Sequence, residues 1–506
     1  MRQWLWERVH GYNAVVWFFM GLVGGLMLAP VFGLTIFSSP AVPLLGLIFG
    51  SFGLIKFRRM FLVSFLICGL LLGLWRGSVA NLENQAFKKY FGQSVEVSGK
   101  LIDDVTIAAD GSNRFKLKEV TINSDNVGGE IWTSVQTNKP LKRSDTVLMK
   151  GFMSEGFGSF SASLVRAEII KIIPTHTSDS GLVVRDRFAA ATEEGIPEPQ
   201  RSLGLGVLLG LKTALPETLA QQIQILGLSH IVVASGYNLT ILVAFARRLF
   251  VKVSKYLSAL VGASMIGGFM LITGLSPSMS RAGLVAGLSL TAWYYGRKIH
   301  PLTLLLVAAG VTLFIRPAYI WGDLGWYLSF TAFFGILVLA PLLHHFFWGK
   351  ERKPSYLREL IIATFSAMKS SLRYDGFRSL PIATLSAQVL TLQIKLYSLG
   401  AYSWYALLAN LLLLPVVPLA MLATFIAGVA GLIVPAAAGL LSLPATILLT
   451  YCTKVIDWLA GFPNVQTEIT ITLAQVFILY GGIILLTVVL MLKTKHNFLK
   501  DKTIVD

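Results

Sequence analysis

Long apolar stretches dominate the chain, and short groups of basic residues separate them. No charged residue lies between Arg8 and Lys56, and none lies between Lys395 and Lys454. A membrane-spanning helix needs about 20 predominantly apolar residues, so each of these runs is long enough for at least two crossings. The pattern therefore predicts a polytopic α-helical membrane protein.

The apolar pattern predicts about twelve crossings, three in an N-terminal membrane region (residues 1–84) and nine in a second membrane region (residues 181–495). They are expected near 13–36, 40–55, 60–80, 226–247, 257–274, 278–296, 299–315, 323–347, 379–397, 402–421, 424–452 and 470–492.

Basic residues indicate which side of the membrane each loop occupies, because short Lys- and Arg-rich loops stay in the cytoplasm. Arg2, Arg8 and the cluster at 56–59 put the N-terminus inside. Four later groups fall on the same side when the crossings are counted: 247–255, 297–298, 350–378 and 493–502. Both termini, including the tail 496–506, are therefore expected in the cytoplasm, with the protein in the cell membrane.

A different pattern occupies residues 85–180, where apolar and polar residues alternate. The segment Val95-Glu96-Val97-Ser98-Gly99 is one example, and Asp-Gly, Gly-Gly and Lys-Pro signals separate such runs. Period-two alternation is typical of half-buried strands. About five strands in a segment of this size predict a small all-β, OB-like barrel. The topology places this inserted domain outside the cytoplasm.

The second membrane region contains three departures from simple crossings. Residues 183–194 have a helical pattern suited to the outer membrane surface. The segment Gly204–Gly210 is too short to cross and is expected to be re-entrant. Pro415 and Pro418 should interrupt a helix and leave carbonyl groups that need partners.

Composition agrees with this fold class and excludes a water-soluble enzyme. Of 506 residues 54% are hydrophobic and only 14% are charged, whereas soluble proteins carry about 25% charge. The 43 Lys and Arg exceed the 26 Asp and Glu, giving a net charge of +17. Most of the excess lies in loops expected inside, so membrane topology explains it better than a nucleic-acid footprint. The β-domain is nearly neutral, with 12 Lys or Arg against 11 Asp or Glu over residues 85–180.

No catalytic or metal-binding pattern is evident. Cys68 and Cys452 lie in apolar runs and are expected to be inert packing residues. The seven histidines form no HExxH arrangement, and residues 206–212 lack the spacing of a phosphate-binding loop. We therefore expect no catalytic residue, cofactor, metal, nuclease or ATPase motif in this chain.

Polar side chains inside crossings are costly in lipid and mark candidate functional positions. His230, Ser235, Asn238 and Thr240 lie in one otherwise apolar crossing, where Ser235-Gly236 also suits a helix break. They could line a pore or contact a substrate. They could equally form interhelical hydrogen bonds worth about 0.6–2 kcal/mol each.

Two further groups lie near predicted outer helix ends. Ser276, Ser278 and Arg281 follow a tight turn, and Arg281 could either bind phosphate or reach the membrane interface. Asp323 could balance the charge of Arg281 or cap the helix that starts there. Gln388 and Asn410 add polar groups near the proline-interrupted stretch.

These motifs, in this order, resemble the competence domain of the ComEC family of inner-membrane DNA-uptake proteins. The resemblance rests on Gly227-Leu228-Ser229-His230 with Ser235-Gly236, on Thr273-Gly274 with Ser276-Pro277-Ser278 and Arg281-Ala282, and on Asp323-Leu324-Gly325-Trp326 with Leu328-Ser329-Phe330. Gly99, Ser144-Asp145 and Lys150-Gly151 are similar to the β-domain of that family. The resemblance covers residues 10–490.

The chain departs from the family pattern at two places. Asn238 stands where the family usually has a second histidine, so a role that needs imidazole there is not expected. Many members also carry a C-terminal metallo-β-lactamase-like domain. This sequence looks like a short form without it, and any nuclease of that kind would come from another protein.

The resemblance implies a channel that passes single-stranded DNA into the cytoplasm during natural transformation. It also implies partners: the DNA strand, membrane lipid, an external DNA receptor, and a cytoplasmic helicase or DNA-binding proteins. In the OB-like domain the candidate DNA-binding residues are Arg114, Phe115, Lys116, Lys118 and Trp132. Phe115 and Trp132 could instead belong to the barrel core.

Two other function classes are compatible with the residues. One is a secondary transporter of a small solute with an accessory β-domain, although the crossings show few charges suited to ion coupling, chiefly Lys395 and Asp457 near helix ends. The other is a membrane-embedded enzyme, which the lack of a catalytic constellation disfavours. Neighbouring genes for a pilus, a DNA receptor or a helicase would distinguish these classes from a DNA channel.

Overall fold

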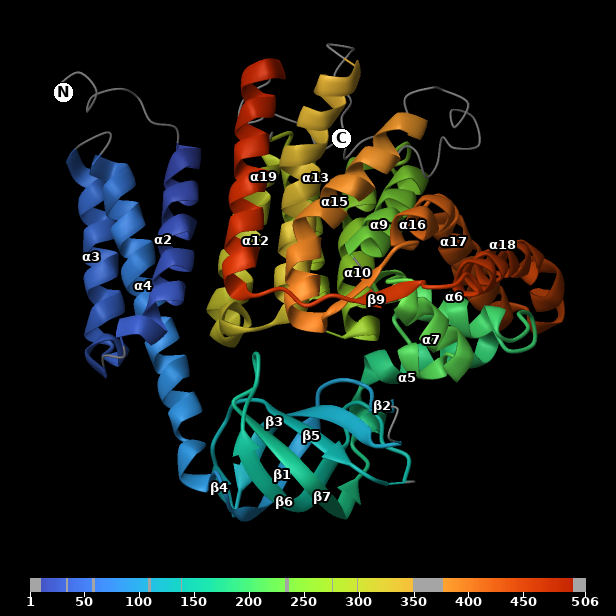
Figure 1. Cartoon of the computed structure of the whole chain (residues 1–506), viewed down its shortest axis with the longest axis horizontal. Coiled ribbons are helices and arrows are strands. Elements are labelled where there is room, and N and C mark those ends of the chain that lie inside the picture. The colour runs from blue at the N-terminus through green and yellow to red at the C-terminus, as the bar shows by residue number, and fades with distance from the viewer. Residues whose placement is uncertain are drawn as a thin grey trace. The chain divides into compact units, whose positions relative to one another are not determined.

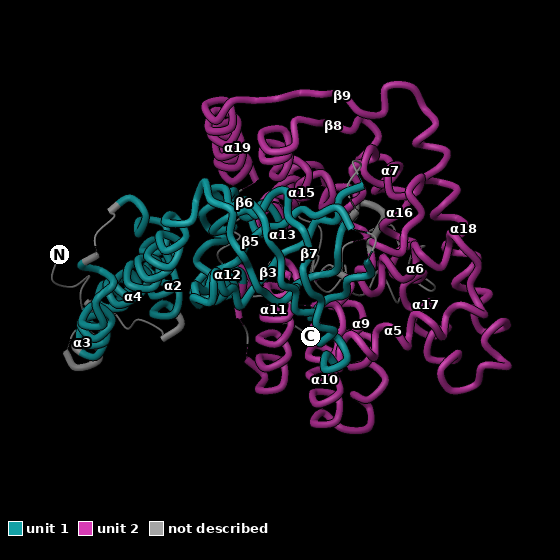
Figure 2. The backbone as a smooth tube through the Cα atoms, turned by 90° about the horizontal axis from the view of Figure 1, so that it is seen from below, with its two compact units in different colours: residues 1–179, 305–326 teal, residues 180–304, 327–506 magenta. Residues whose placement is uncertain are grey.

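The structure, a computed structural model, describes residues 11–32, 35–56, 60–107, 111–137, 139–232, 236–274, 276–297, 299–348 and 376–494. The chain divides into two compact units (Figures 1 and 2). Unit 1 comprises residues 1–179 with 305–326, and unit 2 comprises residues 180–304 with 327–506.

Unit 1 begins with the three predicted apolar helices, α2 (Gly11–Phe32), α3 (Ala41–Lys56) and α4 (Met60–Gln85). A short 3-10 turn, η1 (Thr35–Ser38), precedes α3. Glycines let α2 and α4 pack backbone against backbone: a Cβ on Gly25 would collide with the Leu70 carbonyl, and one on Gly69 with the Phe18 carbonyl. Small residues at four-residue spacing permit this close approach in membranes, where lipid tails offer helices no hydrophobic reason to associate.

The β-domain follows a 3-10 turn, η2 (Lys88–Tyr90). Its strands are β1 (Ser94–Leu101), β2 (Thr106–Ile107), β3 (Asn113–Ile122), β4 (Asp125–Asn126), β5 (Ile131–Val135), β6 (Thr146–Glu155) and β7 (Ala162–Ile173).

Five of these strands close into a barrel in the order β1-β6-β7-β5-β3 and back to β1. Only the β5–β7 pair is parallel. Ranked along the chain, the order 1-4-5-3-2 is that of an OB fold, so the predicted OB-like barrel of about five strands is confirmed. The alternating apolar residues of the strands form the barrel core, where Val97, Leu117, Ile131, Met149 and Leu164 are fully buried.

Two polar contacts in unit 1 hold the turn after α12 (Pro301–Ile315). Arg76 of α4 donates from Nε to the Phe314 carbonyl at 3.0 Å, satisfying a carbonyl that the helix end leaves unpaired. Arg316 pairs with Glu130 of the barrel at 2.6 Å and lies over the Tyr319 ring in η5 (Pro317–Trp321). Burial raises the pKa of the Glu130 carboxyl, and the Arg316 guanidinium opposes that shift.

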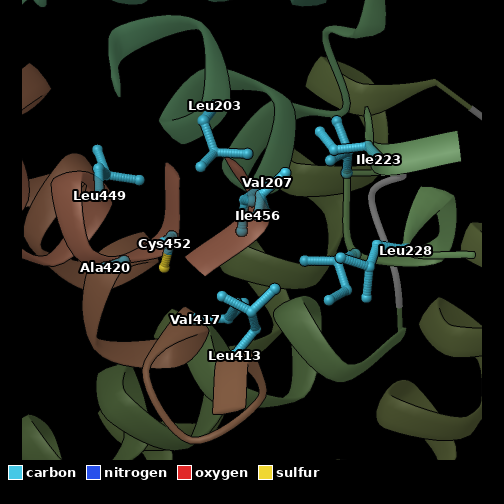
Figure 3. A pocket seen from close by; sticks show the side chains of 12 residues that line it. Leu203, Val207, Ile223, Leu228, Leu413, Val417, Ala420, Leu449, Cys452 and Ile456 are labelled. Carbon is cyan, nitrogen blue, oxygen red and sulfur yellow. The ribbon is translucent and has the colours of Figure 1, made fainter. Parts of the chain in front are cut away.

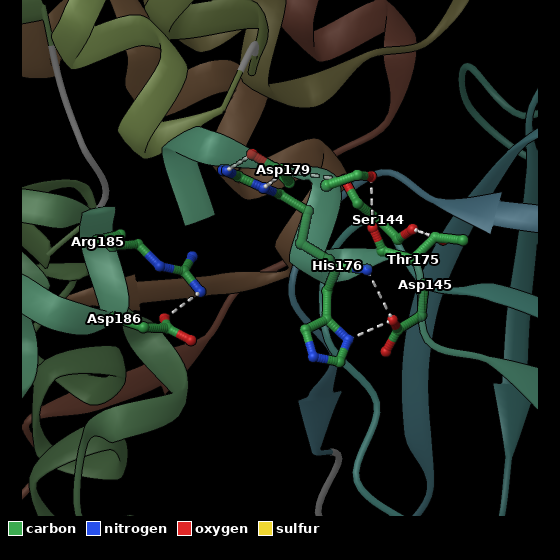
Figure 4. Close-up of polar contacts among 9 residues, drawn as sticks. Ser144, Asp145, Thr175, His176, Asp179, Arg185 and Asp186 are labelled. Atoms are coloured by element: carbon green, nitrogen blue, oxygen red, sulfur yellow. Dashed lines mark hydrogen bonds and ion pairs between the residues drawn. The ribbon is translucent and has the colours of Figure 1, made fainter. Parts of the chain in front are cut away.

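The chain leaves the barrel through a second polar cluster, shown in Figure 4. Asp145 accepts hydrogen bonds from the backbone N–H and the Nδ1 of His176, which lies in η3 (His176–Ser178). Arg143 pairs with both oxygens of Asp179, at 3.1 and 3.2 Å, and Ser144 also donates to Asp179. These contacts fix the last residues of unit 1 against the barrel.

Unit 2 is helical apart from one small sheet. Its first elements are α5 (Ser180–Ala191), α6 (Gln200–Leu209), η4 (Lys212–Ala214), α7 (Glu217–Ile225), α8 (Ser229–Val232), α9 (Gly236–Phe250), α10 (Lys255–Thr273) and α11 (Pro277–Tyr294). After α12, they continue with α13 (Leu324–Trp348), α15 (Gly376–Leu399), β8 (Ala401–Ser403), α16 (Ala406–Leu413), α17 (Val417–Ile433), η6 (Pro435–Ala437), α18 (Ala438–Ala460), β9 (Gln466–Glu468) and α19 (Leu473–Thr494).

Among the residues that the structure describes, six helical segments are long and apolar enough to cross a membrane: Asn13–Val31, Leu62–Tyr90, Lys255–Thr273, Leu324–Trp348, Pro435–Ala460 and Leu473–Thr494. A seventh crossing is possible if α16 and α17, bent by 50°, act as one span. The predicted class of polytopic helical membrane protein is thereby confirmed. The number of twelve crossings, the sidedness of the loops and the domain boundaries stay predictions.

Several predicted crossings are not single helices. The stretch 226–247 is interrupted after α7, where Gly227 has a φ of +67°, and a new helix begins at Gly236. The stretch 402–421 begins as strand β8 and breaks between Leu413 and Val417, as the two prolines predicted. The stretch 424–452 is wrong as one helix, because Pro435 lacks an N–H and disfavours helical geometry at Val434.

The two segments expected to avoid a full crossing have distinct packing. In α5, Phe188 stacks on Phe425 of α17 and lies where Gly428 has no side chain. The ten-residue α6 is buried along almost its whole length and ends at Gly210 in the left-handed conformation. A short buried helix surrounded by protein is what a re-entrant segment requires.

The glycine contacts between α2 and α4 can be tested with neighbouring glycines. We expect Gly25→Ala to lower the free energy of unfolding by about 1–3 kcal/mol, because the added methyl group meets the Leu70 backbone, which cannot move aside. Gly24→Ala is the matched control: its Cβ would lie 3.9 Å from Leu70 Cδ1 and should stabilise the helix by about 0.5–1 kcal/mol. Denaturant unfolding in detergent measures both, and equal effects would contradict this packing.

Candidate functional site

The polar residues expected in the crossing near 230 are arranged around the short helix α8. His230 is exposed, and its Nδ1 lies 3.1 Å from the Gly227 carbonyl. Its Nε2 lies 3.0 Å from Oδ1 of Asn410 in α16, whose Nδ2 donates to the Ala406 carbonyl. Both ring nitrogens therefore face oxygen acceptors. Two residues 180 positions apart, selected separately from the sequence, form one contact here.

Asn238 is used in a different way. It is 2% exposed, and its Nδ2 donates to the Val207 carbonyl at 2.6 Å. Val207 lies in the last turn of α6, where carbonyl groups have no partner within the helix. The Asn238 amide thus caps α6 from another element and is closed off from any aqueous path in this conformation.

Several other predicted residues satisfy local backbone groups. Thr240 donates to the Gly236 carbonyl at 2.7 Å within its own helix. Ser276 caps α11 by accepting from the Met279 N–H, and its hydroxyl lies 3.2 Å from that of Ser278. Asp323 accepts from the Trp326 N–H at 2.7 Å, which is the helix-capping role considered above, and from the Ser159 hydroxyl in the barrel.

Arg281 differs from these because its hydrogen-bonding capacity is mostly unused. Its Nε donates to the Ser329 hydroxyl at 2.7 Å, and its guanidinium lies over the rings of Phe330 and Phe333, at 5.8 and 5.2 Å. Within the described part of the chain Arg281 forms no ion pair. A buried or half-buried guanidinium without a carboxylate favours an anionic ligand with paired oxygens.

Gly236 makes room for this arginine. A Cβ at Gly236 would lie 3.1 Å from Nη2 of Arg281 and 2.8 Å from the Ala282 Cβ. The N-terminus of α9 therefore packs directly on α11 beside the guanidinium. The contact joins two of the sequence motifs, and Ser329 in α13 brings in the third.

Two predicted residues add little to this arrangement. Ser235 lies outside the described residues. Gln388 is half-buried on α15, and its side chain forms no hydrogen bond with the residues that the structure describes. On the same helix Lys395 is close enough to interact electrostatically with the His230 ring.

A small cavity of about 20 Å³ lies beneath α6 and α8, and Figure 3 shows its lining. All twelve lining residues are apolar or cysteine, among them Leu203, Val207, Leu228 and Cys452. Apolar cavities stay dry. The polar residues near position 230 could line a water-filled pore, but this apolar cavity is not such a pore.

In the barrel, the predicted DNA-binding residues separate by strand alternation. Phe115 is 3% exposed and belongs to the core, whereas Trp132 faces outward from β5. Arg114 lies over the Trp132 ring at 5.9 Å. Lys118 lies on β3, and its Nζ is 3.6 Å from Oε1 of the neighbouring Glu119. Phe115 is therefore a barrel-core residue, which is the alternative that the sequence left open for it.

Two aromatic residues that sequence reasoning missed complete this face. Phe157 and Phe160, from the β6–β7 loop, form a chain of edge-to-face contacts with Trp132, with centroids 5.3 and 5.4 Å apart. Lys116 lies over the Phe160 ring at 5.6 Å and pairs with Asp103 at 3.5 Å. We call Arg114, Lys116, Trp132, Phe157 and Phe160 the aromatic face. The sequence signal that could have found them is the presence of two phenylalanines in a glycine-containing loop, residues 156–160.

Metal chemistry has no visible basis in the described residues, where no three His, Cys, Asp or Glu side chains are grouped to hold an ion.

Comparison with known proteins adds two findings. The family model described as "Competence protein" matches residues 207–493. A relative from Bacillus subtilis (strain 168), "ComE operon protein 3", is 21% identical over 250 residues, which is 49% of this chain and 29% of the relative. The matched segment thus spans less than a third of that relative. No solved structure matches the chain.

The role of Asn238 as a cap can be tested by substitution. We expect Asn238→Leu to lower the free energy of unfolding by about 1–3 kcal/mol, because it leaves the Val207 carbonyl buried without a donor. Thr240→Val is the control in the same helix, since its hydroxyl bonds only a carbonyl already inside the helix, and it should change stability by less than about 0.5 kcal/mol. Similar effects of the two changes would contradict the capping role.

Proposed function

The chain belongs to the competence protein family, and from that membership we propose that it passes single-stranded DNA through the cell membrane into the cytoplasm. The observation that carries the proposal furthest is Arg281, a half-buried guanidinium in the first turns of α11 with no carboxylate partner in the described residues. DNA phosphates supply the anionic oxygens that such a group binds. The contact between His230 and Asn410 is a second polar position, and His230 lies six residues before Gly236 in the sequence.

The direction of transport follows from the predicted topology. With both termini in the cytoplasm, the barrel is outside and receives the strand before the membrane bundle does. No motor sequence was recognised in the chain, so we assign the driving force to partners: an external DNA receptor and a cytoplasmic helicase or DNA-binding proteins. The apolar cavity beneath α6 and α8 is consistent with a closed resting conformation.

The aromatic face of the barrel suits the first contact with DNA. Unpaired bases stack on aromatic rings, and nearby cations follow the phosphates, whereas the bases of a duplex are already stacked on one another. The face is composed of strands β3 and β5 and the loop between β6 and β7, which are surfaces that OB folds use for oligonucleotides. Its cations are partly neutralised, since Lys116 already pairs with Asp103. Stacking should therefore contribute more to binding than charge.

The role of Arg281 predicts a graded loss of DNA uptake. Arg281→Gln should reduce uptake of labelled DNA into a nuclease-protected state by at least about tenfold, the equivalent of one charge-assisted hydrogen bond. Arg281→Lys keeps the charge but lacks the paired donors, so its DNA uptake should lie between that of the unaltered protein and that of Arg281→Gln. The assay uses transformable cells in which this chain is the only DNA-internalising protein, with membrane levels of each variant measured.

The control for Arg281 is Lys252→Gln, which removes an exposed cation after α9 and should leave uptake unchanged. Normal uptake by an Arg281→Gln protein present at normal levels would contradict the proposed phosphate contact. Equal losses for both variants would indicate a general charge effect instead.

The aromatic face predicts measurable binding of a labelled pyrimidine oligonucleotide to the full chain in lipid nanodiscs. Trp132→Ala should weaken binding about tenfold, in the range of one stacked base. Asp103→Asn should strengthen binding, because it releases Lys116. The dependence on salt should be shallow, with a log–log slope no steeper than about −2, as expected when about three or fewer phosphates are neutralised.

Phe152→Ala is the matched control for Trp132, because Phe152 is an exposed aromatic residue on β6, a strand that pairs with neither β3 nor β5. Binding unaffected by Trp132→Ala, or equally strong binding of duplex DNA, would contradict the stacking surface.

A further inference from the structure

A small sheet ties two helix connections of unit 2 together. Strand β8 lies between α15 and α16, strand β9 lies between α18 and α19, and the two pair antiparallel, with Tyr402 opposite Thr467. Figure 2 shows them running side by side. The ends of these helices are thereby fixed at a common level.

Exposed aromatic residues gather on and beside this sheet. Trp404 and Trp458 are each 58% exposed. Tyr402 meets Trp404 edge to face at 5.0 Å, and Trp458 meets Phe462 in the same way at 5.3 Å. We call Tyr402, Trp404, Trp458 and Phe462 the ribbon aromatics. Large rings that remain exposed side by side are unfavourable in water and need a partner surface.

The hydrogen bonds of Trp404 give this patch a polar side and an apolar side. The indole Nε1 donates to the Thr467 hydroxyl at 2.9 Å, and the backbone N–H donates to the Val465 carbonyl. The polar edge is thus satisfied by β9 and the loop before it, while much of the ring stays uncovered. Such amphipathic rings favour the boundary between lipid head groups and acyl chains.

The position of the patch along the chain identifies its surroundings. Trp458 lies two residues before the end of α18, and β9 precedes α19 by four residues. Both α18 and α19 belong to segments long and apolar enough to span a membrane. The ends of such segments lie at the head-group level. The patch therefore lies at the ends of two candidate membrane spans.

The local charge argues against a nucleic acid as the occupant. Residues 396–453 carry no charge, and Glu468 is the only charged residue between Phe462 and Thr472; between these windows α18 carries one cation and one anion, Lys454 and Asp457, within a turn of Trp458. A platform for single strands needs cations that follow the phosphates, and this region supplies none on either strand. Aromatic rings beside one cation and one anion, with no excess of positive charge, fit the zwitterionic phospholipid interface instead.

We propose that the ribbon aromatics lie in the head-group layer of the bilayer and anchor the β8–β9 sheet there. The anchor sets where α16 begins, because Tyr405 directly follows Trp404 and stacks on Phe462 at 5.3 Å. It thereby positions Asn410, the partner of His230, at a fixed depth. The lipid contact is a membrane-interface site separate from the DNA-handling residues, and it holds whether or not the chain carries DNA.

Depth measurements in vesicles test the proposal on the full chain. Cys68 and Cys452 are replaced by alanine, and a single cysteine carrying an environment-sensitive fluorophore is introduced by Trp404→Cys, Trp458→Cys or Ile447→Cys. The vesicles contain phosphatidylcholine with a spin label either at the head group or near the end of the acyl chain. Ile447 is the matched control, since it is an exposed residue in the middle of the same α18.

Labels at 404 and 458 should be quenched at least about twofold more by the head-group spin label, and the label at 447 should show the reverse order. Phe157→Cys in the barrel should be quenched by neither. The labels at 404 and 458 each replace a tryptophan, so a second measurement uses the intrinsic tryptophan fluorescence. The double substitution Trp404→Phe and Trp458→Phe should remove part of the tryptophan fluorescence that head-group spin labels quench.

Three results would overturn the proposal. One is that labels at 404 and 458 escape both lipid quenchers but remain open to iodide in the water phase, which would mean that the patch faces water. Another is that 447 and 458 report the same depth, which would mean that α18 does not carry the patch from the membrane interior to its surface. Protection of 404 by an added oligonucleotide would assign the patch to a nucleic acid instead.

Discussion

The constraint on which this structure depends is the cost of ending a helix inside an apolar bundle. The last carbonyl groups of a helix have no partner within it, and lipid offers none. This chain contains several short helices, so distant side chains supply the partners. Arg76 caps α12, and Asn238 caps α6 from another element. Each cap spans a long interval of sequence, and each therefore also fixes how the elements within its own unit pack.

This constraint divides the polar residues that the sequence singled out. Asn238, Thr240, Ser276 and Asp323 use their polar atoms on backbone groups, which makes them structural in this conformation. His230 uses both ring nitrogens, on the Gly227 carbonyl and on Asn410, whereas Arg281 has donors beyond the one given to Ser329. Hydrophobic burial cannot explain a guanidinium placed over two phenylalanine rings without a carboxylate. The functional proposal rests on the residues whose capacity is not consumed by the fold.

The sequence predicted the elements with strong periodicity and failed where periodicity gives no contrast. Alternation located the barrel and its five strands, and it contains the information that places Phe115 inside and Trp132 outside, because adjacent strand residues face opposite sides. In the apolar run 424–452 hydrophobic periodicity gives no contrast, and the signal for the break at Val434 was the single residue Pro435. Phe157 and Phe160 lie in a loop without a pattern, and only the fold brings them to Trp132. The His230–Asn410 contact is likewise a tertiary fact that neither segment encodes alone.

The weakness of the individual sites is itself consistent with a conduit. A polymer that must move on needs contacts favourable enough to admit it and weak enough to release it. Lys116 is already shared with Asp103 and Lys118 with Glu119, so the barrel offers rings more than net charge. Within the bundle, Arg281 is partly satisfied by Ser329 and two aromatic faces, which lowers what a phosphate would gain. A tight DNA-binding protein would concentrate unpaired cations, whereas the barrel and the helical bundle each offer only partial attraction to a phosphate.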